Sequence, residues 1–146
     1  MQIRNIVIGA LLALVLSNTA VANTANVGAG YNFIPGSAYV SLGFRHANFG
    51  VDAFLISMGK EEPTVRPGPE FSLDALGYLP KYPIFAKLGI VAGWGKYGFN
   101  AGLGVDIPII RSWFARLQDT YYRATEDETG GSESENLISL GLHYRF

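Results

Sequence analysis

Apolar and polar residues alternate along much of the chain. The clearest segment is the last, in which one face carries Ile138, Leu140, Leu142, Tyr144 and Phe146. The residues between them are Ser139, Gly141, His143 and Arg145. A helix with this pattern would scatter its apolar residues around the axis, whereas a strand places them all on one face. The period of two therefore predicts β-strands.

Eight such segments follow one another after residue 22. They span residues 25–33, 38–46, 49–58, 70–79, 84–94, 99–107, 113–122 and 138–146. One residue breaks the pattern, because Asp119 falls on the apolar face of its segment. No apolar run beyond residue 22 approaches the roughly 20 residues of a membrane helix, whereas alternating segments of about ten residues are typical of transmembrane strands. We predict an all-β fold, a closed eight-stranded antiparallel transmembrane barrel with an up-and-down meander.

The expected connections differ between the two ends of this barrel. Short turns are expected near Ala47, Lys81 and Ile110, and the other connections lie near Pro35, at residues 59–69, near Gly95 and at residues 124–135. The two long connections, 59–69 and 124–135, are polar and fall at the same end. If both termini face the periplasm, that end faces outward, as in bacterial outer-membrane barrels.

The first 22 residues predict a secretory signal peptide. Arg4 precedes an apolar run over residues 6–16, which is too short to span a membrane, and small residues follow at Ala20 and Ala22. Cleavage after Ala22 would leave residues 23–146 as the barrel domain in the bacterial outer membrane. The alternatives are a buried N-terminal helix or a membrane anchor.

Composition supports a membrane location and excludes several classes of site. Only 16% of the 146 residues are charged, against roughly 25% in soluble domains. Without Arg4 the chain is slightly acidic, and it has no basic patch for nucleic acid. The absence of cysteine excludes disulfides and thiolate metal sites.

An eight-stranded barrel has an interior just wide enough for side chains to fill, so polar inward residues must satisfy one another. The expected lumen network consists of Asp52, Asp74, Lys87, Asp106, Arg116, Gln118, His143 and Arg145. We predict ion pairs such as that of Asp106 with Arg116 on adjacent strands, because an unpaired buried charge is costly. Room for these side chains would come from the inward glycines Gly28, Gly30, Gly43, Gly89, Gly102 and Gly104. A structural network is favoured over a gated ion path.

Several stretches resemble the small eight-stranded outer-membrane barrels similar to the transmembrane domain of outer membrane protein A. They are Leu76-Gly77-Tyr78-Leu79-Pro80, Ala86-Lys87-Leu88-Gly89, Ala101-Gly102-Leu103-Gly104-Val105-Asp106, Ala115-Arg116-Leu117-Gln118 and the last eight residues. The resemblance implies that the barrel-assembly machinery and periplasmic chaperones recognise the final strand. Its insertion signal would comprise Ile138, Leu140, Leu142, Tyr144 and Phe146. The family's interior charges correspond to Lys87, Asp106 and Arg116, but Gln118 stands where the family often has Glu, so no particular salt-bridge gate carries over.

No motif predicts a catalytic residue, a cofactor or a metal. Residues 93–98 match a dinucleotide-binding spacing, but a strand follows instead of the required helix, which indicates a tight hairpin. The acidic residues 126–135 fit no calcium-loop template. Ser139 and His143 share a strand face, but about 13 Å separates them, too far for a base to activate a nucleophile.

We therefore expect a non-enzymatic protein with a role in envelope integrity or in surface contact (adhesion) through residues 59–69 and 124–135. A lipid A-modifying hydrolase with a site across strands, or a small ion or solute channel, is the alternative. The expected partners are outer-membrane lipid and lipopolysaccharide, with no nucleic acid, and the protein is expected to be a monomer.

Overall fold

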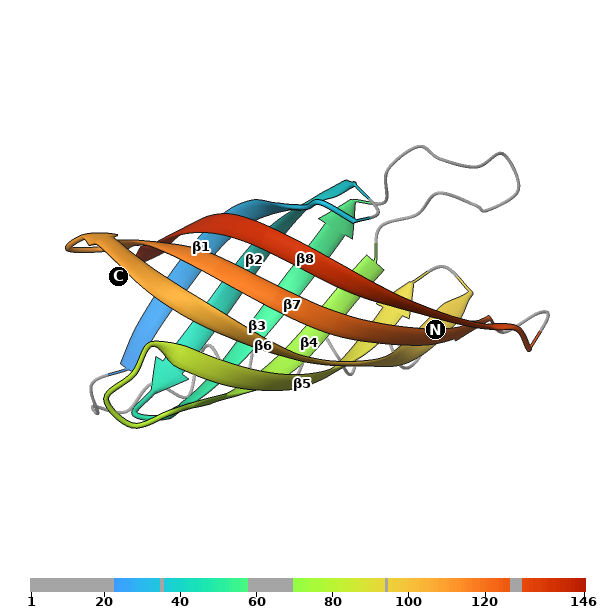
Figure 1. Cartoon of the computed structure of the whole chain (residues 1–146), viewed down its shortest axis with the longest axis horizontal. Helices are drawn as coiled ribbons and strands as arrows, with labels where there is room; N and C mark the ends of the chain where they lie inside the picture. The colour runs from blue at the N-terminus through green and yellow to red at the C-terminus, as the bar shows by residue number, and fades with distance from the viewer. Residues whose placement is uncertain (1–22, 35, 58–69, 94, 127–129) are drawn as a thin grey trace.

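Eight antiparallel strands close into one barrel in the computed structural model, in which β1 pairs with β8 (Figure 1). The structure describes residues 23–34, 36–57, 70–93, 95–126 and 130–146. The strands are β1 (Asn23–Asn32), β2 (Ser37–His46), β3 (Phe49–Ser57), β4 (Glu70–Tyr78), β5 (Ile84–Gly93), β6 (Lys96–Ile110), β7 (Trp113–Glu126) and β8 (Ser132–Arg145). Each strand pairs with its neighbours in the sequence, which confirms the predicted meander.

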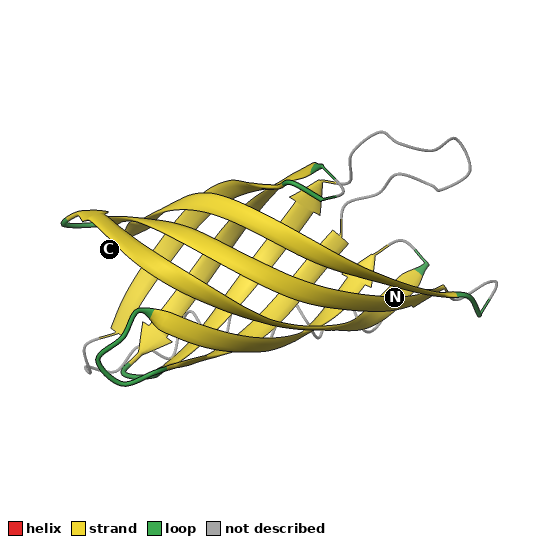
Figure 2. Ribbon diagram, in the orientation of Figure 1, coloured by secondary structure: helices red, strands yellow, loops and turns green. Residues whose placement is uncertain are grey.

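No helix in the described residues is long and apolar enough to cross a membrane. Strands account for most of the described residues, and loops and turns for the others (Figure 2). The predicted signal peptide (1–22) and the predicted connection at 59–69 lie outside the described residues.

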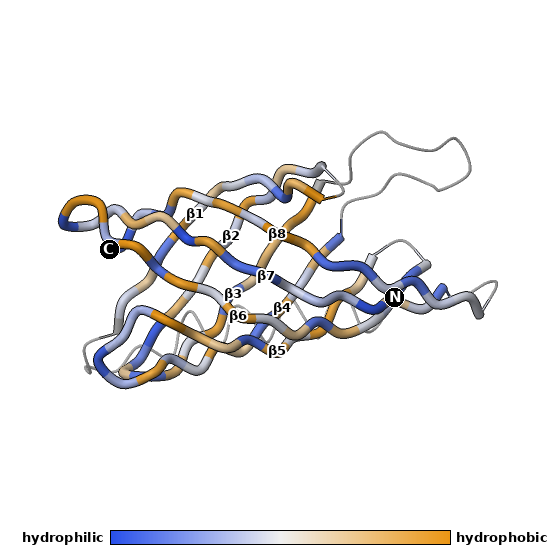
Figure 3. The backbone as a smooth tube through the Cα atoms, in the orientation of Figure 1, coloured by the Kyte–Doolittle hydropathy of each residue, from blue (hydrophilic) through white to orange (hydrophobic). Residues whose placement is uncertain are grey.

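The barrel is polar inside and apolar outside, because its two faces meet different surroundings. Ser72 and Asp74 of β4 and Lys87 of β5 are buried in the lumen, whereas Leu88 and Ile90 of β5 are 64% and 60% exposed on the outer face. Hydropathy changes repeatedly along the strands in the same manner (Figure 3). Large apolar side chains exposed on every side suit a surface that contacts lipid.

Exposed aromatic residues mark both ends of this apolar surface. The end that holds the C-terminus and the turns β2–β3, β4–β5 and β6–β7 is called here the short-turn end, and the opposite end the loop end (Figure 1). The loop-end girdle consists of Tyr31, Phe33, Tyr97, Phe99 and Tyr121, and the short-turn girdle of Phe49, Tyr82, Trp113 and Phe146. Two such girdles are typical of barrels that span a bilayer.

The connections agree with the predicted tight turns. β2 and β3 are joined through the pair His46–Phe49, and β6 and β7 through Ile110–Trp113. At the loop end, Gly95 has a φ of 72°, a conformation that glycine adopts without strain. Gly93 of β5 pairs with Lys96 of β6, as the predicted tight hairpin requires.

The predicted connection over residues 124–135 is wrong in most of its length. β7 continues to Glu126 and β8 begins at Ser132, with pairs such as Ala124–Glu133 between them. β6 is also longer than the predicted 99–107. Over residues 132–136 of β8 both strand faces meet water, so the residues there are polar on both faces and show no alternation.

Candidate functional site

Arg116 on β7 lies at the centre of the lumen and is 1% exposed. Its Nε donates to Asp106 Oδ1 at 2.6 Å, and its Nη2 donates to Asp106 Oδ2 and to Tyr78 Oη, each at 2.9 Å. Its Nη1 donates to Asp52, which reaches it from β3 across the lumen. The predicted pair of Asp106 with Arg116 is present, and a second carboxylate shares the guanidinium.

Aromatic rings enclose this ion cluster. The Arg116 guanidinium lies 4.8 Å from the ring centroid of Phe85 and 5.5 Å from that of Phe114. Phe114 in turn stacks on His143, with ring centroids 5.0 Å apart. We call the central set, whose exposed fractions are 6% or less, the plug: Arg116, Asp52, Asp106, Tyr78 and Phe85. The plug fills the lumen at its level.

A second ion pair lies on the loop side of the plug. Lys87 Nζ is 2.7 Å from Asp74 Oδ2, and it also lies 4.9 Å from the ring centroid of Phe54. Asn100 Nδ2 donates to Asp74 Oδ1 at 2.8 Å and to Ser72 Oγ at 2.9 Å. Asp74 is therefore neutralised by lysine and also held by uncharged donors.

The remaining predicted lumen residues stand outside both ion clusters. Gln118 is buried, but its Oε1 has no partner in the structure. His143 is buried with its Nδ1 3.4 Å from Asn26 Oδ1, while its Nε2 has no partner. Arg145 is half-buried at the short-turn end, and its guanidinium lies over the ring of Phe114 at 4.9 Å. The structure thus unites five of the eight predicted side chains into two clusters.

The six predicted glycines face bulky groups. A methyl group added at Gly28 would overlap the His143 ring, and one at Gly43 would overlap the Asp52 carboxylate. The other obstacles are Asp74 at Gly89, Phe85 at Gly104, and backbone oxygens at Gly30 and Gly102. These positions leave the space that the lumen side chains occupy.

Carboxylates gather at the loop-end mouth of the barrel. Lys96 Nζ is 2.8 Å from Glu133 Oε2 and 3.8 Å from Glu126 Oε1. Tyr122 donates from its Oη to Glu70 Oε1 at 3.3 Å. No group of His, Cys, Asp and Glu in the described residues is arranged to hold a metal ion.

On the outer face, Asp119 is exposed between Leu103 of β6 and Ile138 of β8. It therefore lies on the apolar face, as its position in the sequence indicates. The final strand presents the predicted insertion residues Ile138, Leu140, Leu142 and Phe146 outward. Tyr144 packs between Trp113 and Phe146, with ring centroids 5.0 and 5.2 Å away.

Several residues of the two clusters escaped the sequence prediction. Tyr78 and Phe85 contribute to the plug, and Ser72 and Asn100 to the Asp74 cluster. All four occupy inward positions of alternating segments, so their parity along the strand was the available signal. The aromatic pair was missed because a polar lumen was expected to contain polar side chains.

A closed eight-stranded barrel with a polar, filled lumen and two aromatic girdles is the fold of the small outer-membrane β-barrels. Neisserial surface protein A (NspA) shares this fold with a TM-score of 0.57 and 16% sequence identity, over 88% of this chain and 100% of that one. The Yersinia pestis outer membrane protein Ail, determined in a phospholipid bilayer nanodisc, does so with a TM-score of 0.50 and 15% identity, over 85% of this chain and 99% of that one. No protein-family model and no curated protein matches the sequence.

Proposed function

We propose that this protein is a non-enzymatic outer-membrane barrel that makes surface contacts at its loop end. The observation that carries the proposal is a strand edge with which none of the described residues pairs. β8 pairs with β7 from Ser132 onward, but its pairing with β1 ends at Ser139, with one further bond from Phe33 N to Ile138 O at 2.8 Å. None of the described residues pairs with the other edge over residues 132–137, called here the free edge.

The free edge presents specific backbone groups. Because Ile138 O points toward β1, every second residue before it directs its N–H and C=O to the same side. These residues are Ser132, Ser134 and Asn136, whereas Glu133 and Glu135 direct their backbone groups to β7. An extended polypeptide can add to such an edge by main-chain hydrogen bonds. The two glutamates favour a partner segment with basic side chains.

The lumen supports this assignment over the two alternatives. A channel needs a continuous path, and the plug residues occupy the lumen at mid-height. A lipid A hydrolase needs its nucleophile and base at the lipid surface, but Ser139 and His143 are 1% and 0% exposed inside the barrel. An envelope role is supported by the same closed barrel, because its lumen is filled and its outer face is apolar. We also propose that the signal peptide directs export, that the final strand directs assembly, and that the barrel lies in the outer membrane beside lipopolysaccharide.

The surface-contact role predicts a loss of attachment after a change at the free edge. Ser134→Pro removes a free-edge N–H and leaves the β7 ladder in place, since proline is tolerated on edge strands. We expect bacteria that display this variant to attach to an epithelial cell monolayer less than those with Ser134→Ala, which keeps the backbone donor. Deletion of residues 59–69 and 127–131 together should abolish attachment while the barrel still assembles. Attachment unchanged by both variants would eliminate the contact role.

The closed plug predicts a non-conducting barrel. Purified protein inserted into planar lipid bilayers is expected to produce no discrete current steps, because Arg116 and Phe85 leave no path between the two ends. Insertion should be verified on the same sample by the shift in gel mobility between unboiled and boiled protein. Regular current steps from the unmodified protein would show that the lumen opens and would favour the channel.

A further inference from the structure

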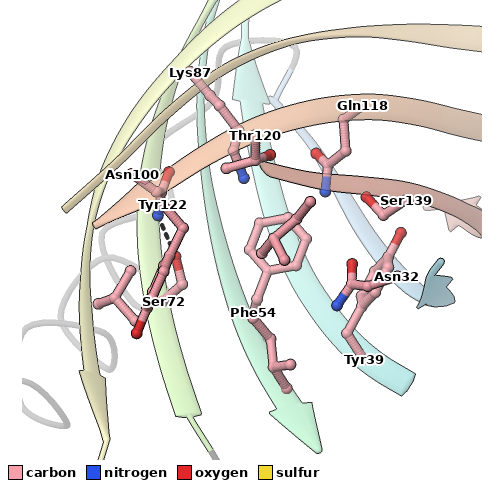
Figure 4. A pocket seen from close by; sticks show the side chains of 13 residues that line it. Asn32, Tyr39, Phe54, Ser72, Lys87, Asn100, Gln118, Thr120, Tyr122 and Ser139 are labelled. Atoms are coloured by element: carbon pink, nitrogen blue, oxygen red, sulfur yellow. Dashed lines mark hydrogen bonds between the residues drawn. The ribbon is translucent and has the colours of Figure 1, made fainter. Parts of the chain in front are cut away.

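The lumen contains a chamber on the loop side of the plug (Figure 4). The chamber has a volume of about 30 Å³, which is enough for more than one water molecule. Lys87 and Gln118 lie at its walls, together with the rings of Tyr39 and Phe54. Lys87 is already paired with Asp74, so the charge of its ammonium group is balanced.

Four buried oxygen atoms of residues that line the chamber have no hydrogen-bond partner among the described residues. They belong to Tyr39, Asn100, Gln118 and Thr120, whose exposed fractions are 6% or less. The orientation of Asn100 is determined by its Nδ2, which donates to Ser72 and Asp74, and its Oδ1 is thereby left as an acceptor. Buried oxygen atoms of this kind require a hydrogen-bond partner. A water molecule or a small solute that occupies the chamber can supply it.

Among the described residues, the chamber is accessible on its loop side. Ile56 and Leu137 line it on the loop side, and both inward-facing side chains are half-buried, so solvent reaches them. On the other side, Arg116 is 1% and Phe85 0% exposed. Solvent therefore enters from the loop end and stops at the plug.

The described residues around the entrance carry an excess of negative charge. Four carboxylates, those of Glu70, Glu126, Glu133 and Glu135, stand there with a single lysine, Lys96. Lys96 contacts Glu133 and Glu126, while Glu70 is held by the phenol of Tyr122. An acidic rim around a narrow polar cavity concentrates cations and repels anions.

We propose that the loop-end half of the barrel is a dead-end vestibule that accepts small monovalent cations from outside and holds them on uncharged oxygen atoms in front of the plug. No carboxylate lines the chamber in the described residues, which favours a singly charged ion over a calcium ion, whose sites are rich in carboxylates. The vestibule shares Glu133 and Glu135 with the free edge, but its test measures cation access to the chamber wall and needs no partner at that edge.

The test uses a cysteine in the chamber wall, since the chain has none of its own. Thr120→Cys in intact cells is treated from outside with a cationic and an anionic methanethiosulfonate reagent of similar size. The quantity compared is the ratio of the two reaction rates, divided by the same ratio measured on the denatured variant. We expect this corrected ratio to favour the cationic reagent at least about tenfold. The preference should fall toward unity in 1 M salt and in the Glu133→Gln/Glu135→Gln background.

Further comparisons separate the vestibule from a simple surface effect. Potassium should slow the reaction of Thr120→Cys more than tetraethylammonium at equal ionic strength, because only the smaller ion fits the chamber. Ser112→Cys at the short-turn end should stay unmodified from outside, as should the lipid-facing Leu140→Cys. Gln118→Cys serves as a second chamber position if Thr120→Cys does not assemble. Equal rates for both reagents, absence of reaction at both chamber positions, or equal protection by both cations would overturn the proposal.

Discussion

Arg116→Met is expected to destabilise the folded barrel by about 3–5 kcal/mol, because the change leaves buried carboxylates without their cation. Asp52 and Asp106 both depend on this guanidinium. Methionine has a similar length and fits between the rings of Phe85 and Phe114, so lost charge rather than lost volume dominates. Unfolding by urea in lipid vesicles, followed by the mobility of unboiled protein on gels, measures the difference.

Two companion variants determine the cause of the Arg116→Met effect. Asp52→Asn and Asp106→Asn in the same chain should restore much of the stability, because no buried charge then lacks a partner. Arg111→Met, in the exposed short turn, is the matched control and should change stability by less than about 0.5 kcal/mol. If Arg116→Met proved as stable as Arg111→Met, the ion cluster would not hold the lumen together.

Gly28→Ala is expected to cost roughly 1–3 kcal/mol through overpacking of the lumen. The added methyl group meets the ring of His143, which is fully buried and stacked on Phe114. The ring therefore has little room to move. Urea unfolding in vesicles again gives the measurement.

Gly77→Ala provides the comparison, since an added Cβ at this outward position meets nothing within 4 Å. Its stability should equal or slightly exceed that of the unmodified protein, because alanine loses less backbone entropy than glycine on folding. Combining Gly28→Ala with His143→Ala should cost less than the sum of the two single changes. Equal losses at Gly28 and Gly77, or strict additivity with His143→Ala, would exclude the steric explanation.

Much of the fold and of the lumen was predictable because successive residues along a strand face opposite sides of the sheet, a property called parity here. Alternation places Asp52, Asp74 and Lys87 inside because water and lipid require opposite surfaces, and the sequence reports this requirement directly. Neighbouring strands also suffice to pair Asp106 with Arg116. The contact of Asp52 with Arg116 was not predictable, since it crosses the lumen and depends on strand tilt and stagger, which no local pattern encodes.

The ends of β7 and β8 were hidden for a different reason. Over residues 132–136 both strand faces meet water, and of residues 123–126 only Ala124 is buried, so neither segment needs a continuous apolar face. The polar sequence there resembles a loop, although backbone pairing continues through Thr125 and Ser132. Parity fails as a signal wherever both sides of a sheet have the same solvent. The candidate free edge was therefore visible only from the pairing register.

Asp119 has a consequence for the surrounding bilayer. Two exposed apolar side chains, Leu103 and Ile138, flank it, and Tyr121 of the loop-end girdle follows two residues later. A membrane thick enough to cover both neighbours would also cover the carboxylate, so the hydrocarbon must thin along the β6–β8 flank or tilt with the barrel. Unless the barrel tilts, we expect the first ring of lipids to be thinner beside this flank than elsewhere, and membrane components that prefer thin hydrocarbon to collect there.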